Sequence, residues 1–234
     1  MQTQQPILIT GIPRSGATMI AATINLCGAF VGNVTKRSMY CNERIRDCLV
    51  KPYFVLRHVD PNAQKDYPQV ITIPKNWKDN VETILSLEGY QGGSWLYKDS
   101  RSCQMWPVWN AAYPDAKWVI VRRRTGDILE SCLRTKYMNA YDTREGWLEM
   151  VHEYEYRFVE MITEGCNCKI IWPERMVGGD YQQLIELCEW LGLKWNNDSL
   201  KFIDTLLWKS RQKKGGCYGE EKDSDISMQE YQGY

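Results

Sequence analysis

A glycine-rich turn near the N-terminus constrains the fold more than any other feature of the sequence. Residues 7–10 (Ile-Leu-Ile-Thr) are apolar enough for a buried strand, and Gly11-Ile-Pro-Arg-Ser-Gly16 follows directly. Residues 17–26 then have the pattern of a helix, which Gly28 ends. A strand, a glycine loop and a helix in this order are typical of the first unit of an α/β protein.

Three further short segments predict strands, at residues 94–97, 117–121 and 169–172. Helices are predicted at residues 43–56 (with a bend at Pro52), 80–87, 104–113, 127–138, 143–164, 180–191 and 199–210. Segment 143–164 is the clearest, because its apolar residues from Trp147 to Ile162 recur every three or four positions. Strands that alternate with helices require crossover connections. The sequence therefore predicts a three-layer α/β/α fold with a mostly parallel central sheet.

The overall charge excludes a general polyanion binder. Lys and Arg total 29, and Asp and Glu also total 29, so the formal net charge is zero. We therefore expect no nucleic-acid partner, and any anion site must come from a local cluster. No apolar run reaches the roughly 18 residues of a membrane span, and the first residues lack the pattern of a secretory signal. We expect a cytoplasmic protein with no membrane span.

Cysteine and histidine usage limits the possible chemistry. The nine cysteines are scattered with no C-x-x-C pair, which favours reduced thiols that pack as small apolar groups. His58 and His152 are the only histidines, so a histidine-rich metal site is excluded and no metal is expected. Catalysis must then depend mostly on carboxylates, lysines, arginines and hydroxyls.

The glycine loop has the spacing of a phosphate-binding loop, G-x-x-x-x-G followed by hydroxyl residues. Backbone N–H groups in such a loop converge on an anion, and the helix N-terminus adds its positive dipole end. The position of the NTPase lysine is Ala17, so Arg14 is the available cation, with hydroxyls from Ser15 and Thr18. A tight strand-to-helix turn with an incidental arginine is the alternative interpretation.

Residues Pro13-Arg14-Ser15-Gly16-Ala17-Thr18 resemble the first cofactor loop of the PAPS-dependent sulfotransferases, Pro-Lys/Arg-Ser/Thr-Gly-Thr-Thr/Ser. PAPS is 3′-phosphoadenosine 5′-phosphosulfate. The resemblance implies a P-loop-like fold in which residues 14–18 bind the 5′-phosphosulfate. Ala17 departs from the pattern, because the family usually has a hydroxyl residue there.

A second segment resembles the family's 3′-phosphate motif, a strand ending in Arg and a helix with Ser eight residues later. In residues 117–131, Arg123 and Ser131 match if Asp127 is the motif's aspartate, although the register could shift to Arg122. Thr125 replaces the usual proline. Residues 117–136 also carry six positive and two negative side chains. Three consecutive arginines there favour an anion partner, with a solvated face as the alternative.

The resemblance extends from about residue 6 to residue 217. It includes Trp95-Leu-Tyr-Lys-Asp99, Tyr113-Pro-Asp-Ala-Lys117 and residues 173–193. Residues 211–216 are similar to the loop that closes over the 3′-phosphate, which implies a contact from Lys214 and Gly215. We thus expect one domain over residues 1–217, in which residues 30–93 bind the acceptor, and an acidic tail over residues 218–234.

The resemblance implies sulfuryl transfer from PAPS to an unidentified acceptor. A cation must neutralise the leaving phosphate, and Arg14 is the first candidate and Lys98, at the end of a predicted central strand, the second. Glu43 is the candidate base, although Asn42-Glu43 also has the pattern of a helix N-cap followed by a first-turn acid. His58 is the alternative base. The competing functions are a P-loop kinase or NTPase and a non-catalytic nucleotide-binding protein of the same fold.

Overall fold

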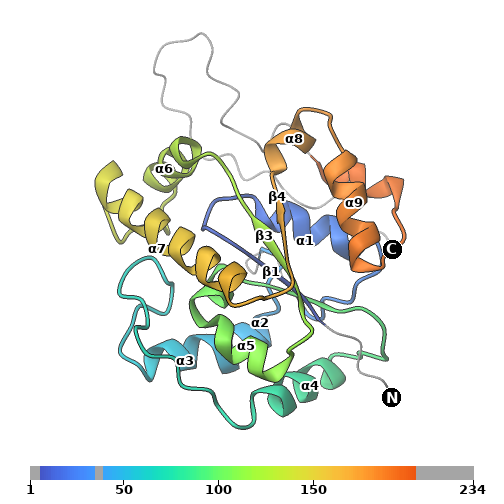
Figure 1. The fold of residues 1–234 in the computed structure, drawn as a ribbon, viewed down its shortest axis with the longest axis horizontal. Helices are drawn as coiled ribbons and strands as arrows, with labels where there is room; N and C mark the ends of the chain where they lie inside the picture. The colour runs from blue at the N-terminus through green and yellow to red at the C-terminus, as the bar shows by residue number, and fades with distance from the viewer. Residues whose placement is uncertain (1–5, 35–38, 204–234) are drawn as a thin grey trace.

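The computed structural model describes residues 6–34 and 39–203 of the 234-residue chain. Four parallel strands form its central sheet in the order β2-β1-β3-β4. They are β1 (Ile7–Gly11), β2 (Leu96–Lys98), β3 (Lys117–Val121) and β4 (Cys168–Ile171). The prediction of an α/β fold with a parallel sheet is confirmed (Figure 1). The strand that ends at Lys98 was expected to be central, but β2 is an edge strand of the described sheet. On its outer side there is only an isolated bridge between Phe30 and Trp95.

The strand register brings the carboxyl ends of the central strands to one level. Gly11 pairs with Val121, and Val121 pairs with Ile171 across the other side of β3. Ligands of open parallel sheets bind at this edge, where the loops that follow the strands meet. The glycine loop after β1 and the arginine run after β3 therefore lie next to each other.

Helices cover both faces of the sheet (Figure 1). One face is packed by α2 (Glu43–Ile45), α3 (Lys51–Val55), α4 (Trp77–Leu87), α5 (Trp106–Ala112), α6 (Thr125–Arg134) and α7 (Arg144–Thr163). The other is packed by α1 (Ala17–Leu26), α8 (Pro173–Val177) and α9 (Gln182–Leu191). The three layers agree with the sequence prediction.

Local helix geometry differs from the prediction at several points. The predicted helix 43–56 is divided by the π-helical turn η1 (Arg46–Val50), and Pro52 lies at the start of α3, where its missing N–H costs no helix bond. The predicted helix 104–113 begins as the 3-10 helix η2 (Ser100–Met105). Residues 197–202 form a 3-10 helix, η3 (Asn197–Phe202), and the rest of the helix predicted to residue 210 lies outside the described residues.

Strand side chains alternate between two apolar clusters. Leu8 and Trp118 face the α5–α7 side, whereas Ile7 and Val119 face the α1 and α9 side. The long helix α7 buries the predicted stripe from Trp147 to Met161. Ile162 is 49% exposed, because Met161 takes the inward position in the last turn. The aromatic content thus mostly fills the core, with Trp109, Trp118 and Trp147 fully buried.

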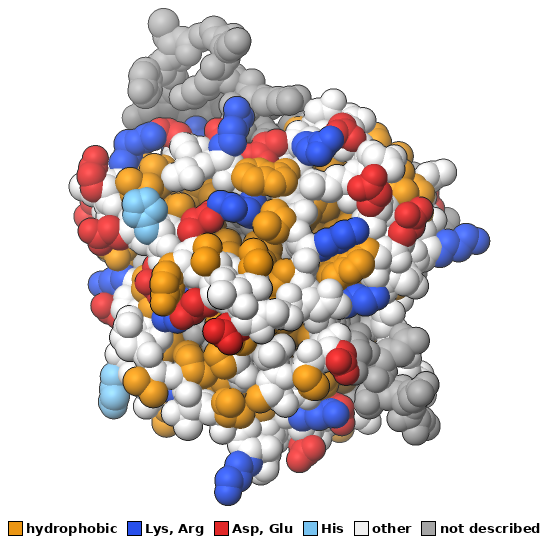
Figure 2. Space-filling view, viewed as in Figure 1, with side chains coloured by type: hydrophobic (Ala, Val, Ile, Leu, Met, Phe, Trp, Pro, Cys, Tyr) orange, Lys and Arg blue, Asp and Glu red, His pale blue; other side chains and the backbone are white. Residues whose placement is uncertain are grey.

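The surface and thiols fit the composition. Figure 2 shows basic and acidic side chains interspersed over the visible face, as a net charge of zero predicts. The described cysteines are all free thiols, and Cys217 lies outside the described residues. Among the described helices, none has the length and apolar content that crossing a membrane requires.

Candidate anion-binding site

The glycine loop runs from the end of β1 to the start of α1 in a conformation that requires its glycines. A Cβ on Gly11 would lie 2.5 Å from Val121 O and 2.6 Å from Ser15 Oγ, so no larger residue fits beside β3. Gly16 has φ 95° and Arg14 has φ 73°, both in the left-handed region. For the non-glycine Arg14 this conformation is strained, and such strain is concentrated at functional sites.

The loop presents polar groups that lack protein partners. Ser15 is 1% exposed, and its Oγ has no hydrogen-bond partner within the described part of the chain. No described side chain caps the first turn of α1, whose N-cap is Gly16. A buried hydroxyl and an uncapped helix N-terminus are the donors that an anion such as phosphate or sulfate requires.

Arg14 connects the loop to helix α6. Its Nε donates a 2.8 Å hydrogen bond to Ser131 Oγ, and its Nη1 donates a 2.8 Å hydrogen bond to Tyr137 Oη. Arg123 reaches the same loop from the end of β3, because its Nη1 donates to the Arg14 carbonyl oxygen at 3.0 Å. The structure therefore brings together Arg14, Arg123 and Ser131, which come from two separate sequence motifs.

The three consecutive arginines have different surroundings. Arg122 pairs with Glu155 of α7 and lies over the Trp172 ring, 5.4 Å from its centroid. Arg124 is exposed and pairs with Asp127 at 3.1 Å. Arg123 is directed at the glycine loop, and burial lowers its pKa, with the charges of Arg14 and Arg124 acting in the same direction. Of the two possible registers, the geometry favours Arg123 for an anion at the loop.

Lys98 adds a buried cation at the end of β2. The residue is 8% exposed, and its Nζ donates to Met39 O at 2.8 Å. Thr18 Oγ1 donates to the same carbonyl oxygen at 3.2 Å. Burial lowers the pKa of Lys98, Cys41 and Asp99 oppose this shift, and the charges of Arg101 and Arg14 add to it. Lys98 thus lies within electrostatic range of Arg14 and shares a partner with the loop.

The two candidate bases, Glu43 and His58, both lie in segment 30–93. Asn42 is the N-cap of α2, accepting from Ile45 N at 3.0 Å, so the capping interpretation of this pair is confirmed. Glu43 is the first residue of α2, and its Oε1 lies 3.6 Å from Arg46 Nη2. His58 is exposed in the turn after α3, with its N–H donating to Val55 O at 3.0 Å. Lys214 and Gly215 lie outside the described residues.

Comparison with solved structures identifies the fold. The sulfotransferase domain from the curacin biosynthetic pathway matches with TM-score 0.59 and 12% identity, covering 86% of this chain and 77% of that one. The sulfotransferase domain from the Synechococcus PCC 7002 olefin synthase matches with TM-score 0.56 and 16% identity, covering 92% and 91%. This chain has a sulfotransferase fold. Sulfotransferase STF1 from Mycobacterium tuberculosis H37Rv matches with TM-score 0.50 and 12% identity, covering 86% and 71%. No protein-family model and no curated protein matches the sequence.

In this sulfotransferase fold, a buried charge network that sequence analysis missed supports the end of β2. Asp99 accepts from Arg101 Nε at 2.8 Å, from Arg101 Nη2 at 2.7 Å and from Tyr97 Oη at 2.9 Å. Burial would raise the pKa of Asp99, but the charge and hydrogen bonds of Arg101 outweigh it and hold the pKa below its ordinary value. Arg101 Nη1 also donates to Pro61 O at 2.9 Å, which ties segment 30–93 to the sheet edge.

Tyr137 and Met39 were also missed. Tyr137 lies three residues after α6 and contacts Arg14, and Met39 contacts Lys98 and Thr18 through its carbonyl oxygen. Backbone contacts such as that of Met39 leave no trace in residue type. For Tyr137, the only indication in the sequence was that it follows the predicted site residue Ser131 by six positions.

Proposed function

We propose that this protein transfers the sulfuryl group of PAPS to an acceptor hydroxyl or amine. The carrying observation is the meeting of Arg14, Arg123 and Ser131 at the carboxyl edge of β1 and β3, through contacts of 2.8 and 3.0 Å. These contacts support one donor site that is built from the two motifs that resemble the family's. The fold shared with three sulfotransferases supports the same proposal.

The residues present fit a donor with two anionic ends. The buried Ser15 hydroxyl, the uncapped start of α1 and Arg14 match the 5′-phosphosulfate, together with the backbone of Gly16 and Ala17 and the hydroxyl of Thr18. Arg123 and Ser131 would hold the 3′-phosphate, since a guanidinium and a hydroxyl both donate to phosphate oxygens. We expect Lys214 and Gly215 to complete this half.

The chemistry requires charge stabilisation more than covalent participation by the protein. When bound, PAPS would supply an activated sulfuryl group and leave as the 3′,5′-bisphosphate PAP. Arg14 and Lys98 would neutralise the charge that develops on the leaving phosphate, in the way cations stabilise phosphoryl transfer. Glu43 would accept the proton of the acceptor, with His58 as the alternative base. Among the described residues, no group of three or more His, Cys, Asp or Glu side chains could hold a metal ion.

Segment 30–93 is the proposed acceptor-binding region, because Arg101 ties it to the edge of the sheet where the donor residues meet. The acceptor itself is not specified by the residues. A cytoplasmic location is part of the same proposal.

A P-loop kinase or NTPase is the competing function, and thermal unfolding with three nucleotides separates the two. A ligand at 100 times its dissociation constant adds about 2.7 kcal/mol, which raises the midpoint of a protein of this size by roughly 5–10 °C. We expect this rise with PAP and a smaller one with ADP or ATP–Mg²⁺. A larger rise with ATP–Mg²⁺ would identify the loop as an NTPase loop. If PAP binds, assay of acceptors with PAPS distinguishes an active enzyme from a non-catalytic nucleotide-binding protein.

A further inference from the structure

Two buried cysteines lie in contact on the α1 and α9 face of the sheet, away from the candidate site. Cys27 directly follows α1 and Cys188 lies in α9, and their Sγ atoms are 3.7 Å apart across 161 residues of sequence. Cys27 is 7% exposed and Cys188 is fully buried. A disulfide requires an S–S distance of about 2.05 Å. Disulfide formation therefore requires the two Sγ atoms to approach each other by roughly 1.7 Å.

The hydrogen bonds around the pair give the two thiols different roles. Cys188 Sγ donates to Cys27 Sγ, and Ser199 Oγ lies 3.4 Å from Cys27 Sγ. The hydrogen bond from Cys188 lowers the pKa of Cys27 against the opposing effect of burial, and Ser199 adds to the lowering. The pKa of Cys188 is raised by the same contact and by burial. Cys27 also lines a pocket that is open to solvent, whereas Cys188 does not, so we assign Cys27 as the nucleophile of the pair.

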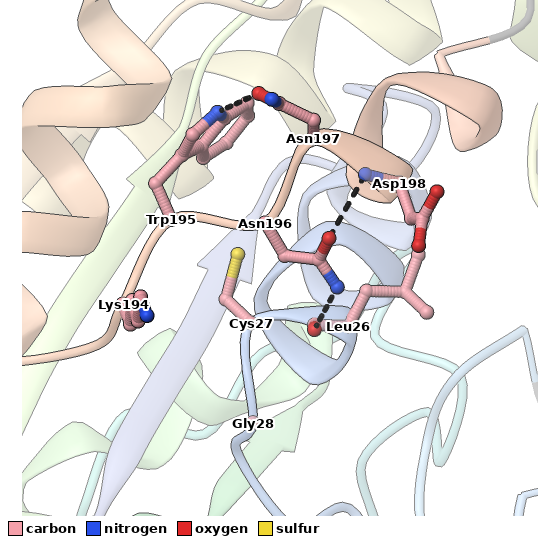
Figure 3. Close-up of a pocket in the computed structure, with 8 residues that line it drawn as sticks. All are labelled: Leu26, Cys27, Gly28, Lys194, Trp195, Asn196, Asn197 and Asp198. Atoms are coloured by element: carbon pink, nitrogen blue, oxygen red, sulfur yellow. Dashed lines mark hydrogen bonds between the residues drawn. The ribbon is translucent and has the colours of Figure 1, made fainter.

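A pocket gives small molecules access to Cys27. It has a volume of about 520 Å³, is open to solvent, and is lined by residues 26–28 and 194–198 (Figure 3). Figure 3 shows the Cys27 sulfur beside Asn196, whose Nδ2 donates to Leu26 O at 3.1 Å. The exposed Lys194 and Asp198 contribute to the same lining. The Cys27 thiol has little exposed surface, but a reagent that enters this pocket can still reach it.

We propose that Cys27 and Cys188 form a reversible disulfide, with a low-molecular-weight disulfide such as oxidised glutathione as the oxidant. Cys27 Sγ attacks one sulfur of oxidised glutathione, the glutathione S–S bond breaks, and the first glutathione thiolate leaves. Cys188 Sγ then attacks Cys27 Sγ and displaces the second glutathione. The two leaving thiolates take up the two cysteine protons. The two cysteines together lose two electrons, and these electrons reduce one glutathione disulfide to two thiols.

The disulfide would clamp the end of α1 to α9. The cross-link would close a long loop, so it should raise the midpoint of thermal unfolding by roughly 5–15 °C. The glycine loop is at the opposite end of α1, about 15 Å along a helix of ten residues. We therefore expect oxidation to stabilise the fold and leave nucleotide binding unchanged.

The test is peptide mapping of the full chain, reduced or incubated with oxidised glutathione, by mass spectrometry after non-reducing proteolysis. The expected result is a cross-linked peptide that joins Cys27 to Cys188. Its mass should be about 2 Da below the sum of the two reduced peptides, because the disulfide removes two hydrogen atoms. The exposed Cys48 is the internal control, because its modification by glutathione shows that the oxidant is active. Modified Cys48 without the cross-linked peptide would overturn the proposal.

A variant pair confirms the assignment of roles. Cys188→Ala should leave Cys27 as a stable mixed disulfide with glutathione and abolish the oxidation-dependent rise of the midpoint, whereas Cys48→Ser should keep that rise. A rise that persists in Cys188→Ala would contradict the proposal. Thermal unfolding under reducing conditions shows whether Cys188→Ala folds. If it does not fold, the peptide map of the wild-type protein decides whether the disulfide forms.

Discussion

Arg14 Nε and Ser131 Oγ form a 2.8 Å hydrogen bond between two segments that are 117 residues apart in the chain. The contact exists because β1 and β3 are neighbours in register, with Gly11 opposite Val121. The loop after β1 and the helix after β3 therefore start side by side. A basic group from one segment and a hydroxyl from the other are held at one site before any ligand binds.

Replacing Ser131 by alanine tests this contact. In Ser131→Ala, Arg14 Nε loses its acceptor and the proposed 3′-phosphate loses a donor. One such hydrogen bond contributes about 0.5–1.5 kcal/mol, so we expect the dissociation constant of PAP to rise by roughly 2- to 13-fold. Isothermal titration calorimetry measures it. Ser86→Ala, at an exposed position of α4, is the matched control and should leave the constant unchanged. Equal constants for the two variants would exclude Ser131 from the site.

The loop geometry makes Gly11 sensitive to a single methyl group. Gly11→Ala would place Cβ 2.5 Å from a backbone oxygen of β3, so the strands must shift, and overpacking of this kind costs about 1–3 kcal/mol. Gly126→Ala is the control, because a Cβ there meets nothing within 4 Å, and Gly→Ala at a compatible backbone position stabilises by about 0.4–1 kcal/mol. Urea unfolding should show opposite signs for the two variants. A stable Gly11→Ala protein would mean that the loop does not pack against β3 as described.

Local patterns predicted the fold and the loop because both depend on short-range rules. Glycine spacing between an apolar strand and a helix is set by backbone geometry, so Gly11, Arg14 and Gly16 could be predicted from sequence. The choice between Arg122 and Arg123 could not. Consecutive residues of an extended chain point to opposite sides, and the partner that engages Arg122 is Glu155, which lies 33 residues away on α7.

Tertiary contacts account for the other differences. Lys98 was expected in a central strand, but the position of β2 in the sheet depends on which strands pair, and residue type does not specify this. The contact between Tyr137 and Arg14 depends on the path of the chain after α6. Asp99 and Arg101 are two residues apart, and only their burial distinguishes them from an ordinary surface pair.

The buried Lys98 predicts a specific pH dependence of stability. Burial lowers its pKa in the folded state, so just below the ordinary value of about 10.5 the unfolded chain holds a proton that the folded chain has lost. The unfolded state then binds more protons, and the free energy of unfolding contributed by Lys98 rises with pH through this window. We expect wild type to gain stability relative to Lys98→Met as the pH rises toward the ordinary lysine pKa of about 10.5.

Urea unfolding of both proteins at several pH values measures this difference and cancels the other titrating groups. Lys78→Met, at an exposed position of α4, is the matched control for removing a lysine, and the Lys98 effect must exceed it. A difference that is flat or falls with rising pH would show that Lys98 is not desolvated in the folded protein.

The central claim is a donor site that recognises a 3′-phosphate through Arg123, and calorimetric binding of PAP and AMP tests it most directly. AMP lacks only the 3′-phosphate, and charged hydrogen bonds contribute about 1.5–3 kcal/mol, so wild type should bind PAP roughly 10- to 150-fold more tightly than AMP. Arg123→Ala should abolish most of that preference, whereas Arg122→Ala, with its guanidinium held by Glu155, should preserve it. Equal affinities of wild type for PAP and AMP, or equal losses for both nucleotides in Arg123→Ala, would contradict the account.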